Sequence, residues 1–474
     1  MGAGKRGGED VGRVGGFTLK GIAQKKEPAS YEWIGNIPTD WKIEKLKRIL
    51  ISPLMYGTNE AAELEDKDLP RYIRITDFNV DGILREDTFK SLPFDKAEGY
   101  YLKEGDVLFA RSGATVGKSF IFNNYKGRAC FAGYLIKASP NPYKLLPDFL
   151  YYYTQSSAYD IWCSSIFTQA TIQNISATKY AYLPIPLPSI TIQQRIAAYL
   201  DKTCAAIDKA IEAKQKQLEI LDALRKSIIH KAVTRGLDDL VELKDSGVEW
   251  LGRIPKHWRI EKLKRLLSQP LMYGTNEAAE LDDPEYPRYI RITDFGDNGT
   301  LKPESFKSLP PDKAEGYYLK EGDLLFARSG ATVGKSFLFS NYKGLACFAG
   351  YLIRARTNKI KLFPKYLYYF TKSPAYFTWK NVIFTQATIQ NISATKYAYL
   401  PVSVPSVNEQ QLIIQYLDMK MKSLENMQSN LSDQISTLEQ YRKSLIHECV
   451  TGKRRITKEM FENSGTKQKI KALN

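Results

Sequence analysis

The segment Ala110–Ser119, with the sequence ARSGATVGKS, comes closest to a chemical motif because it looks like a phosphate-binding loop. Such a loop places four residues between its first glycine and a Gly-Lys pair. Here only three residues separate Gly113 from Gly117-Lys118, and Ser112 stands where the glycine is required. The pattern therefore argues against nucleotide binding. It favours a tight turn between two strands, whose backbone N–H groups and Lys118 could contact a phosphate.

Two further segments look like enzyme motifs but lack a required residue. SPNPYK at 139–144 is similar to the Asn-Pro-Pro-aromatic motif of amino-methyltransferases, yet it has no second proline and no glycine-rich cofactor loop precedes it. The acidic pair Glu65-Asp66 could mimic a nuclease metal site, but in the repeated segment described below Pro284 replaces the lysine that follows it. The three histidines form no metal-ligand pattern with a cysteine. We therefore predict that the chain is not an enzyme by itself and carries no metal site.

The formal net charge of +16 is the most informative feature of the composition. An excess of this size points to a polyanionic partner, usually nucleic acid, although a merely basic soluble surface is the simpler alternative. Charge alone does not distinguish DNA, RNA and an acidic protein. The 5 cysteines form no close pairs, which is typical of reduced thiols in a cytoplasmic protein. No apolar run approaches the roughly 18 residues needed to cross a bilayer, so we expect no membrane contact.

The chain contains two copies of one unit. Leu200-Asp201 returns as Leu417-Asp418, an offset of 217 residues, and Trp33 returns as Trp250 with the same offset. The segment FTQATIQNISATKYAYLP at 167–184 returns unaltered at 384–401. A chain of 474 residues is too long for one core, and two blocks of about 150 residues plus helices fit the usual domain size. The repeat therefore predicts two globular blocks, each followed by a long helix.

Each copy ends in a long segment with the apolar spacing of a helix. From about 189 to 236, apolar residues that include Leu200 and Leu224 recur at steps of three, four and seven. From about 406 to 452, a matching seam includes Leu417 and Met427. A lone helix cannot bury so narrow a stripe, so each segment needs a partner helix, and the other segment supplies it.

Within each block the pattern predicts an α+β fold made mostly of strands. Strand-like alternation occurs at 71–78, 106–111 and 118–122, with glycine-rich turns between these segments. The segment 144–163 looks helical, and its tyrosines at 151–153 are more typical of a core than of a base-stacking surface. We divide the chain into a tail that is disordered or foreign to the natural protein (1–28), a first block (29–188), a central long helix (189–236), a linker with the second block (237–405), a C-terminal long helix (406–452) and a basic tail (453–474).

Four polar stretches in each block contain the residue types that contact DNA. Base readout uses Asn, Gln, Arg, Lys, Ser and Thr, whereas phosphate contacts use Lys, Arg and backbone N–H groups. The candidates in the first copy are Tyr56, Asn59, Arg74, Thr76, Arg111, Ser112, Thr115, Lys118, Thr168, Gln169, Thr171, Gln173, Asn174 and Lys179. Those in the second copy are Tyr273, Asn276, Arg291, Thr293, Arg328, Ser329, Thr332, Lys335, Thr385, Gln386, Thr388, Gln390, Asn391 and Lys396. The alternative for any one of them is that its side chain caps a strand or a turn.

The sequence resembles a known family, the specificity subunits of type I restriction–modification systems. The resemblance rests on IPTDWKIEKLKRIL at 37–50 and DSGVEWLGRIPKHWRIEKLKRLL at 245–267, ahead of the two blocks. It also rests on the YGTN, YIRITDF and ARSGATVGK segments within the blocks and on LPIPLPSITIQQRIAAYLD at the end of the first. It covers about residues 31–451, in both copies and in the order of the family.

The resemblance implies two target-recognition domains joined by two long helices that pair as an antiparallel coiled coil with pseudo-two-fold symmetry. Each domain would read one half of a bipartite site in double-stranded DNA. Two methyltransferase (modification) subunits would dock on this frame, and restriction (motor-nuclease) subunits could join them. The methyl donor S-adenosylmethionine is expected in the methyltransferase partner, and no cofactor is expected in this chain.

The two blocks differ from the family's usual pattern because they are nearly the same, whereas the family usually carries two dissimilar domains. We therefore predict an interrupted palindrome: a short sequence, an unread spacer and the reverse complement of that sequence. Two other classes of function stay open. One is a stand-alone sequence-specific DNA-binding regulator, and the other is a coiled-coil scaffold whose basic surface meets only proteins.

Overall fold

The computed structural model describes residues 31–462, except 62, 80–81, 168–172, 279, 297–298, 331 and 386–390. The chain forms two compact units. One unit comprises Met1–Ala206 and Gln440–Asn474, and the other comprises Ile207–Glu439. Each unit therefore combines one globular block with the start of one long helix and the end of the other.

The first block is built on a four-stranded antiparallel sheet in the order β2-β7-β4-β5. Two smaller pairs flank it, the parallel pair β3-β6 and the antiparallel pair β1-β8. The strands are β1 (Lys42–Lys45), β2 (Met55–Tyr56), β3 (Arg71–Ile73), β4 (Asp106–Ala110), β5 (Ser119–Phe122), β6 (Ala129–Phe131), β7 (Leu135–Ala138) and β8 (Pro184–Leu187). The helices are α1 (Phe94–Ala97), α2 (Pro147–Tyr153), α3 (Ser157–Phe167) and α4 (Ala177–Ala181), with short 3-10 turns at Leu46–Arg48, Ile75–Asp77 and Glu86–Thr88.

The second block repeats this topology, with the sheet order β12-β17-β14-β15 and the pairs β13-β16 and β11-β18. A hairpin of β9 (Leu243–Asp245) and β10 (Arg253–Pro255) precedes it. The other strands are β11 (Arg259–Lys262), β12 (Met272–Tyr273), β13 (Arg288–Ile290), β14 (Leu324–Ala327), β15 (Ser336–Leu338), β16 (Ala346–Phe348), β17 (Leu352–Ala355) and β18 (Pro401–Val404). The helices are α6 (Pro311–Ala314), α7 (Pro364–Phe370), α8 (Pro374–Thr385) and α9 (Ala394–Ala398), with 3-10 turns at Leu263–Arg265, Ile292–Asp294 and Pro303–Ser305. The α+β class predicted from the sequence is confirmed in both blocks.

The segment 71–78, which was expected to be one strand, is a strand only as far as Ile73. The next residues turn because Asp77 is fully buried and accepts bonds from the backbone N–H and the guanidinium of Arg74, each at 2.7 Å. A buried carboxylate is costly unless it is paired and hydrogen-bonded. The chain therefore bends back to supply these partners, and the second block repeats the turn at Asp294.

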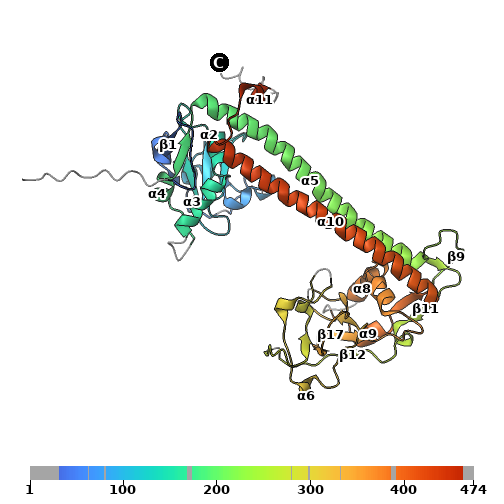
Figure 1. The fold of residues 1–474 in the computed structure, drawn as a ribbon. Coiled ribbons are helices and arrows are strands. Elements are labelled where there is room, and N and C mark those ends of the chain that lie inside the picture. The colour runs from blue at the N-terminus through green and yellow to red at the C-terminus, as the bar shows by residue number, and fades with distance from the viewer. Residues whose placement is uncertain are drawn as a thin grey trace, which may run out of the picture. The chain divides into compact units, whose positions relative to one another are not determined.

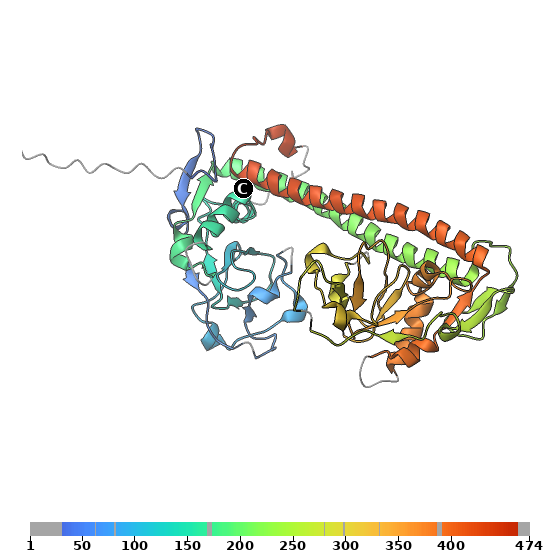
Figure 2. The same ribbon diagram turned by 60° about the horizontal axis from the view of Figure 1, so that its bottom comes forward.

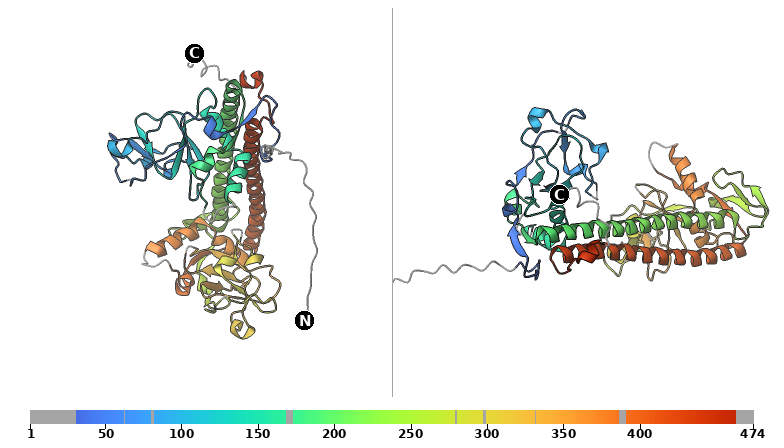
Figure 3. Two further views of the ribbon diagram at one scale, coloured as in Figure 1. Left: turned by 90° about the vertical axis from the view of Figure 1, so that its left-hand side faces the viewer. Right: turned by 90° about the horizontal axis from the view of Figure 1, so that it is seen from above.

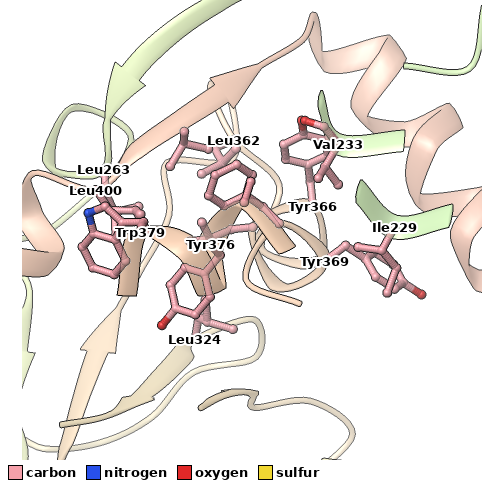
Figure 4. Packing of buried hydrophobic residues seen from close by; sticks show 14 of the residues in the cluster. Ile229, Val233, Leu263, Leu324, Leu362, Tyr366, Tyr369, Tyr376, Trp379 and Leu400 are labelled. Carbon is pink, nitrogen blue, oxygen red and sulfur yellow. The ribbon is translucent and has the colours of Figure 1, made fainter. Parts of the chain in front are cut away.

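Each block anchors the ends of the long helices in its own core. In the second unit, Ile229 and Val233 from the end of α5 (Ile190–Arg235) join the cluster that contains Tyr366 and Trp379 (Figure 4). The hydroxyl of Tyr366 donates to the backbone oxygen of Val233 at 3.2 Å. In the first unit, the Tyr152 hydroxyl donates to Asp201 of α5 at 2.7 Å. Tyr152 and Tyr153 are buried, as their pattern predicted.

The two long helices, α5 and α10 (Val407–Val450), pack against each other, as Figure 1, Figure 2 and Figure 3 show. Arg225 of α5 donates to Gln428 of α10 at 2.6 Å, and Lys214 bonds Gln434. From Lys214 to Arg225 the residue numbers of α5 increase, while those of their partners in α10 decrease from Gln434 to Gln428. The two helices are therefore antiparallel. The structure thus confirms the two predicted helices and their pairing. A final short helix, α11 (Lys458–Glu462), follows α10.

The seam between the helices is narrower than the apolar pattern suggested. Leu200 and Leu417 are fully buried, as predicted. The expectation that Leu224 and Met427 share the buried seam is wrong, because they are 44% and 52% exposed. A two-helix pair encloses only one narrow stripe, and apolar residues beside that stripe stay in water.

His230 and His447 lie at corresponding positions near the ends of the two long helices. The Nδ1 atom of each ring is buried without a hydrogen-bond partner among the described residues, and burial lowers the pKa of each imidazole. When a folded-state pKa is depressed in this way, the unfolded chain takes up protons first as the pH falls. The neutral rings therefore contribute stability that is present above about pH 6.5 and is lost as the pH falls below it.

We predict that the melting temperature falls between about pH 7 and pH 5 and that glutamine at both positions flattens this fall. Scanning calorimetry across that range tests the prediction. If the melting temperature of the double variant depended on pH in the same way as that of the unmodified protein, these rings would not be responsible for the fall.

Candidate nucleic-acid interface

In the first block, three chain segments meet at one end of the four-stranded sheet. Arg111 directly follows β4, and its backbone N–H donates to the Tyr134 oxygen at 3.0 Å. Tyr56 lies opposite Ile136 of β7. The chain returns to the same place after α3, where Ser112 and Asn174 form a β-bridge. The sheet register thus gathers candidates that are far apart in the sequence.

Arg111 and Tyr56 form the centre of this group. The guanidinium lies 4.7 Å from the centre of the Tyr56 ring, and its Nη1 donates to the Gly133 oxygen at 3.4 Å. The Tyr56 hydroxyl accepts a hydrogen bond from the backbone N–H of Ala177 at 2.9 Å. Stacking on an aromatic face holds a guanidinium in one orientation. Among the described residues no carboxylate pairs with Arg111, so its charge is available to a ligand.

Asn59 and Tyr134 complete the group. A Cβ added at Gly133 would lie 1.9 Å from Asn59 Oδ1, so only glycine allows the exposed Asn59 side chain to lie there. The next residue, Tyr134, is 65% exposed on a turn that the Leu135 N–H closes at 2.9 Å from the Ala132 oxygen. Sequence reasoning missed Tyr134. Its signal was an aromatic residue after a glycine, in a turn between two strands.

We call Tyr56, Asn59, Arg111, Tyr134 and Asn174 the first Tyr–Arg cluster. The second block builds the same arrangement, with the guanidinium of Arg328 at 4.9 Å from the ring centre of Tyr273. The Tyr273 hydroxyl accepts from the Ala394 N–H at 2.8 Å. The second Tyr–Arg cluster therefore comprises Tyr273, Asn276, Arg328, Tyr351 and Asn391, and its Tyr351 is 66% exposed.

Arg74 and Arg291, both candidates from the sequence, are engaged inside the protein. Arg74 holds the buried Asp77 with two guanidinium bonds and also donates to the Thr88 oxygen at 2.7 Å. Arg291 makes the equivalent ion pair with Asp294 at 2.7 Å. The guanidinium of each arginine therefore donates hydrogen bonds that stabilise its own turn. The neighbouring Thr76 and Thr293 are exposed.

The loop that resembles a phosphate-binding motif is the connection between β4 and β5. The Ala110 N–H donates to the Lys118 oxygen at 2.8 Å and the Gly117 N–H to the Ala110 oxygen at 2.9 Å, which closes the loop as a hairpin end. Lys118 is exposed and Thr115 is partly exposed, as are their counterparts Lys335 and Thr332. The tight turn predicted from the sequence is therefore observed.

The remaining candidates fall into two groups. Gln173 and Lys179 are exposed, and Ser329 and Lys396 are partly exposed. Thr168, Gln169, Thr171, Gln386, Thr388 and Gln390 lie outside the described residues, as does the side chain of Thr385 at the end of α8.

A basic edge adjoins α4. Lys47 Nζ lies 4.0 Å from the ring centre of Tyr182 and lowers the pKa of that phenol, and Lys264 lowers the pKa of Tyr399 in the same way.

Over residues 31–462, with the gaps given above, no group of His, Cys, Asp and Glu is placed to hold a metal ion. Within the same ranges, no helix is both long and apolar enough to cross a membrane.

A family model described as the type I restriction modification DNA specificity domain matches residues 38–222 and again residues 262–437. The chain belongs to this family. Membership confirms the resemblance to type I specificity subunits and the expectation of a non-catalytic subunit.

Known specificity subunits are similar over most of the chain. The StySPI specificity subunit of Salmonella potsdam is 21% identical over 440 residues, which cover 88% of this chain and 90% of that subunit. The putative MjaX specificity subunit of Methanocaldococcus jannaschii is 27% identical over 248 residues, which cover 50% of this chain and 55% of that subunit.

Solved structures share the fold. The HsdS subunit from Thermoanaerobacter tengcongensis has a TM-score of 0.51 at 15% identity and is covered to 98%, with 88% of this chain. A chain from a study of complex assembly and conformational transition of the type I R-M system reaches a TM-score of 0.69 at 15% identity, with 88% and 100% coverage.

Proposed function

We propose that this specificity subunit directs a type I restriction–modification complex to an interrupted palindrome in double-stranded DNA. Each Tyr–Arg cluster would read one of two identical half-sites. Because the two long helices run antiparallel, the half-sites would be inverted relative to one another.

One observation carries this proposal: the segments that build the two clusters are unchanged between the copies. They are 53–64, 70–78, 108–120, 129–136 and 166–184, which return without a substitution 217 residues later. Chemically identical faces prefer the same bases, since readout depends on the donors and acceptors presented to the groove. The substitutions Arg128 to Leu345 and Asn79 to Gly296 lie outside these segments.

The clusters contain the groups that base readout needs. An arginine forms its commonest specific contact with the O6 and N7 atoms of guanine, and asparagine pairs with adenine. Arg111 is held by its stack on Tyr56, while Asn59 is exposed beside it. Lys118 and Lys179 are exposed and would contact phosphates, which positions the protein without reading sequence.

The other subunits of the system would complete the enzyme. We propose that two methyltransferase subunits dock on the paired helices and bring S-adenosylmethionine with them. Restriction subunits could then join to permit cleavage. A stand-alone regulator would bind the site without these subunits, and a coiled-coil scaffold would not bind it at all.

A selection on random duplex DNA tests the proposal, with and without a co-expressed methyltransferase subunit. We expect enrichment of one half-site and its reverse complement around an unread spacer, sharper when the methyltransferase is present. Two unrelated half-sites would refute the palindrome while leaving the subunit assignment intact. Equal enrichment without any methyltransferase binding would favour the regulator, and no enrichment under either condition would favour the scaffold.

A further inference from the structure

The two blocks share their Tyr–Arg clusters but differ in charge on the helices beside them. Gln155, which follows α2, corresponds to Lys372, and Cys163 of α3 corresponds to Lys380 of α8. The second block therefore carries two positive charges that the first block lacks. The proposal of a palindromic site does not involve these residues.

Both extra lysines lie against the end of the loop that begins at Arg328. Lys372 Nζ donates to the backbone oxygen of Ser336 at 2.8 Å. A Cβ added at Gly334 would lie 2.3 Å from Cδ of Lys380, so that side chain runs directly over the glycine. Lys335, an exposed candidate for phosphate contact, lies between these two positions in the sequence.

The lysines at this loop have no counter-charge. Among the described residues no carboxylate forms an ion pair with Lys335, Lys372 or Lys380. Burial and the nearby charge of Lys335 lower the pKa of Lys372 to about 8, and burial lowers the pKa of Lys380. The like charges of Lys372 and Lys335, with Lys372 partly withdrawn from water, are unfavourable together unless an anion joins them.

The matching place in the first block lacks both lysines, and the charge of Asp160 acts on the Cys163 thiol there. The thiol of Cys163 would lie 3.3 Å from a Cβ added at Gly117, where Lys380 lies in the other copy. Cys163 and its neighbour Tyr159 are buried. The loop itself, 111–118, is identical to 328–335, so the difference in charge comes only from the helices.

We propose that Lys335, Lys372 and Lys380 bind a backbone phosphate of DNA beside the second half-site, a contact that the first block cannot match. The proposal rests on the proposed function, because the same loop carries Arg328 of the second Tyr–Arg cluster. DNA is favoured over an acidic protein since this loop joins the lysines to that cluster. The subunit thus binds two identical half-sites with unequal strength, and the second block holds DNA more firmly.

The two copies provide their own matched variants. Lys372→Gln with Lys380→Cys gives the second block the residues of the first, and Gln155→Lys with Cys163→Lys does the reverse. Each variant is assembled with methyltransferase subunits and titrated with a duplex that contains the selected site, from about 50 to about 200 mM salt. Melting temperatures of the variants confirm that they are folded.

We expect the slope of log affinity against log salt to become shallower by up to about 0.9 in the first variant, because this variant loses at most the one phosphate contact that the lysines share. The weakening between the two salt concentrations would then be about 3.5-fold smaller than in the unmodified complex. The reciprocal variant should steepen the slope by a similar amount.

Unchanged slopes with intact sequence-specific binding would overturn this inference and leave the proposed function standing. Loss of methyltransferase binding with an unchanged slope would overturn it in favour of an acidic protein surface. Absence of specific binding by the unmodified complex would instead refute the proposed function.

Discussion

Alanine in place of Arg111 should weaken binding to the selected DNA site by about 5- to 150-fold. This range follows from the roughly 1 to 3 kcal/mol that a two-bond contact between arginine and a base contributes to discrimination. Arg111 is suited to such a contact because Tyr56 and the Gly133 oxygen fix its guanidinium and no described carboxylate neutralises it. Arg328 occupies the same surroundings, so Arg328→Ala should cause a loss of equal size.

Titration of labelled duplexes measures these losses, and repeated selection shows which base is released. We expect a guanine in one half-site to become degenerate in each single variant, and the two losses to multiply in the double variant because the sites are independent. Arg111→Lys keeps the charge but loses the planar fork. Binding of this variant to unrelated DNA should stay unchanged, and the base preference should still be lost.

Lys126→Ala serves as the control, since Lys126 is exposed in a turn outside the Tyr–Arg cluster. If Arg111→Ala weakened binding to specific and unrelated duplexes equally, with no change in the selected site, the arginine would be a phosphate contact and the assignment of base readout to the cluster would be wrong.

Alanine in place of Arg74 should destabilise the first block by about 3 to 5 kcal/mol. Removing one partner of a buried ion pair leaves the other charge uncompensated, which has a cost of this size. Asp77 is the partner left behind: it is fully buried, and it would lose both guanidinium bonds while keeping the backbone N–H bond of residue 74 at 2.7 Å. The loss is larger than that expected from an ordinary surface arginine.

Urea unfolding followed by circular dichroism measures this change, and separate transitions for the two units are to be fitted separately. Thr76→Ala is the matched control because Thr76 is exposed on the same turn and should change stability by less than about 0.5 kcal/mol. A stable Arg74→Ala variant that loses a base preference would mean that Arg74 reads DNA after all.

Residue type alone could not show which of Arg74 and Arg111 is available to contact DNA. Arg74 and Arg111 have the same chemistry and lie in equally polar stretches. The difference arises from what surrounds them, since a buried carboxylate three residues away takes the donors of Arg74. No sequence pattern showed that Asp77 would be buried, and the same burial shortened the strand expected at 71–78.

The long helices could be predicted closely because their evidence is local. Apolar spacing marked segments at 189–236 and 406–452, and the helices run from Ile190 to Arg235 and from Val407 to Val450. The exposure of Leu224 and Met427 could not be predicted in the same way. Which apolar residues are covered depends on where the partner helix lies.

The sequence by itself determined the repeat, the two helices, the α+β class and the family resemblance, because periodicity and internal identity are properties of the chain alone. Only the tertiary structure decided which polar residues share a surface. Arg111 lies beside Tyr56 and Tyr134 because strands β2, β7 and β4 are neighbours in the sheet although they are far apart in the sequence. Asn174 joins them because the chain after α3 forms a β-bridge with Ser112. The extra lysines of the second block likewise come to lie against the loop only because helix and loop pack together, and electrostatic interactions depend on distance in space.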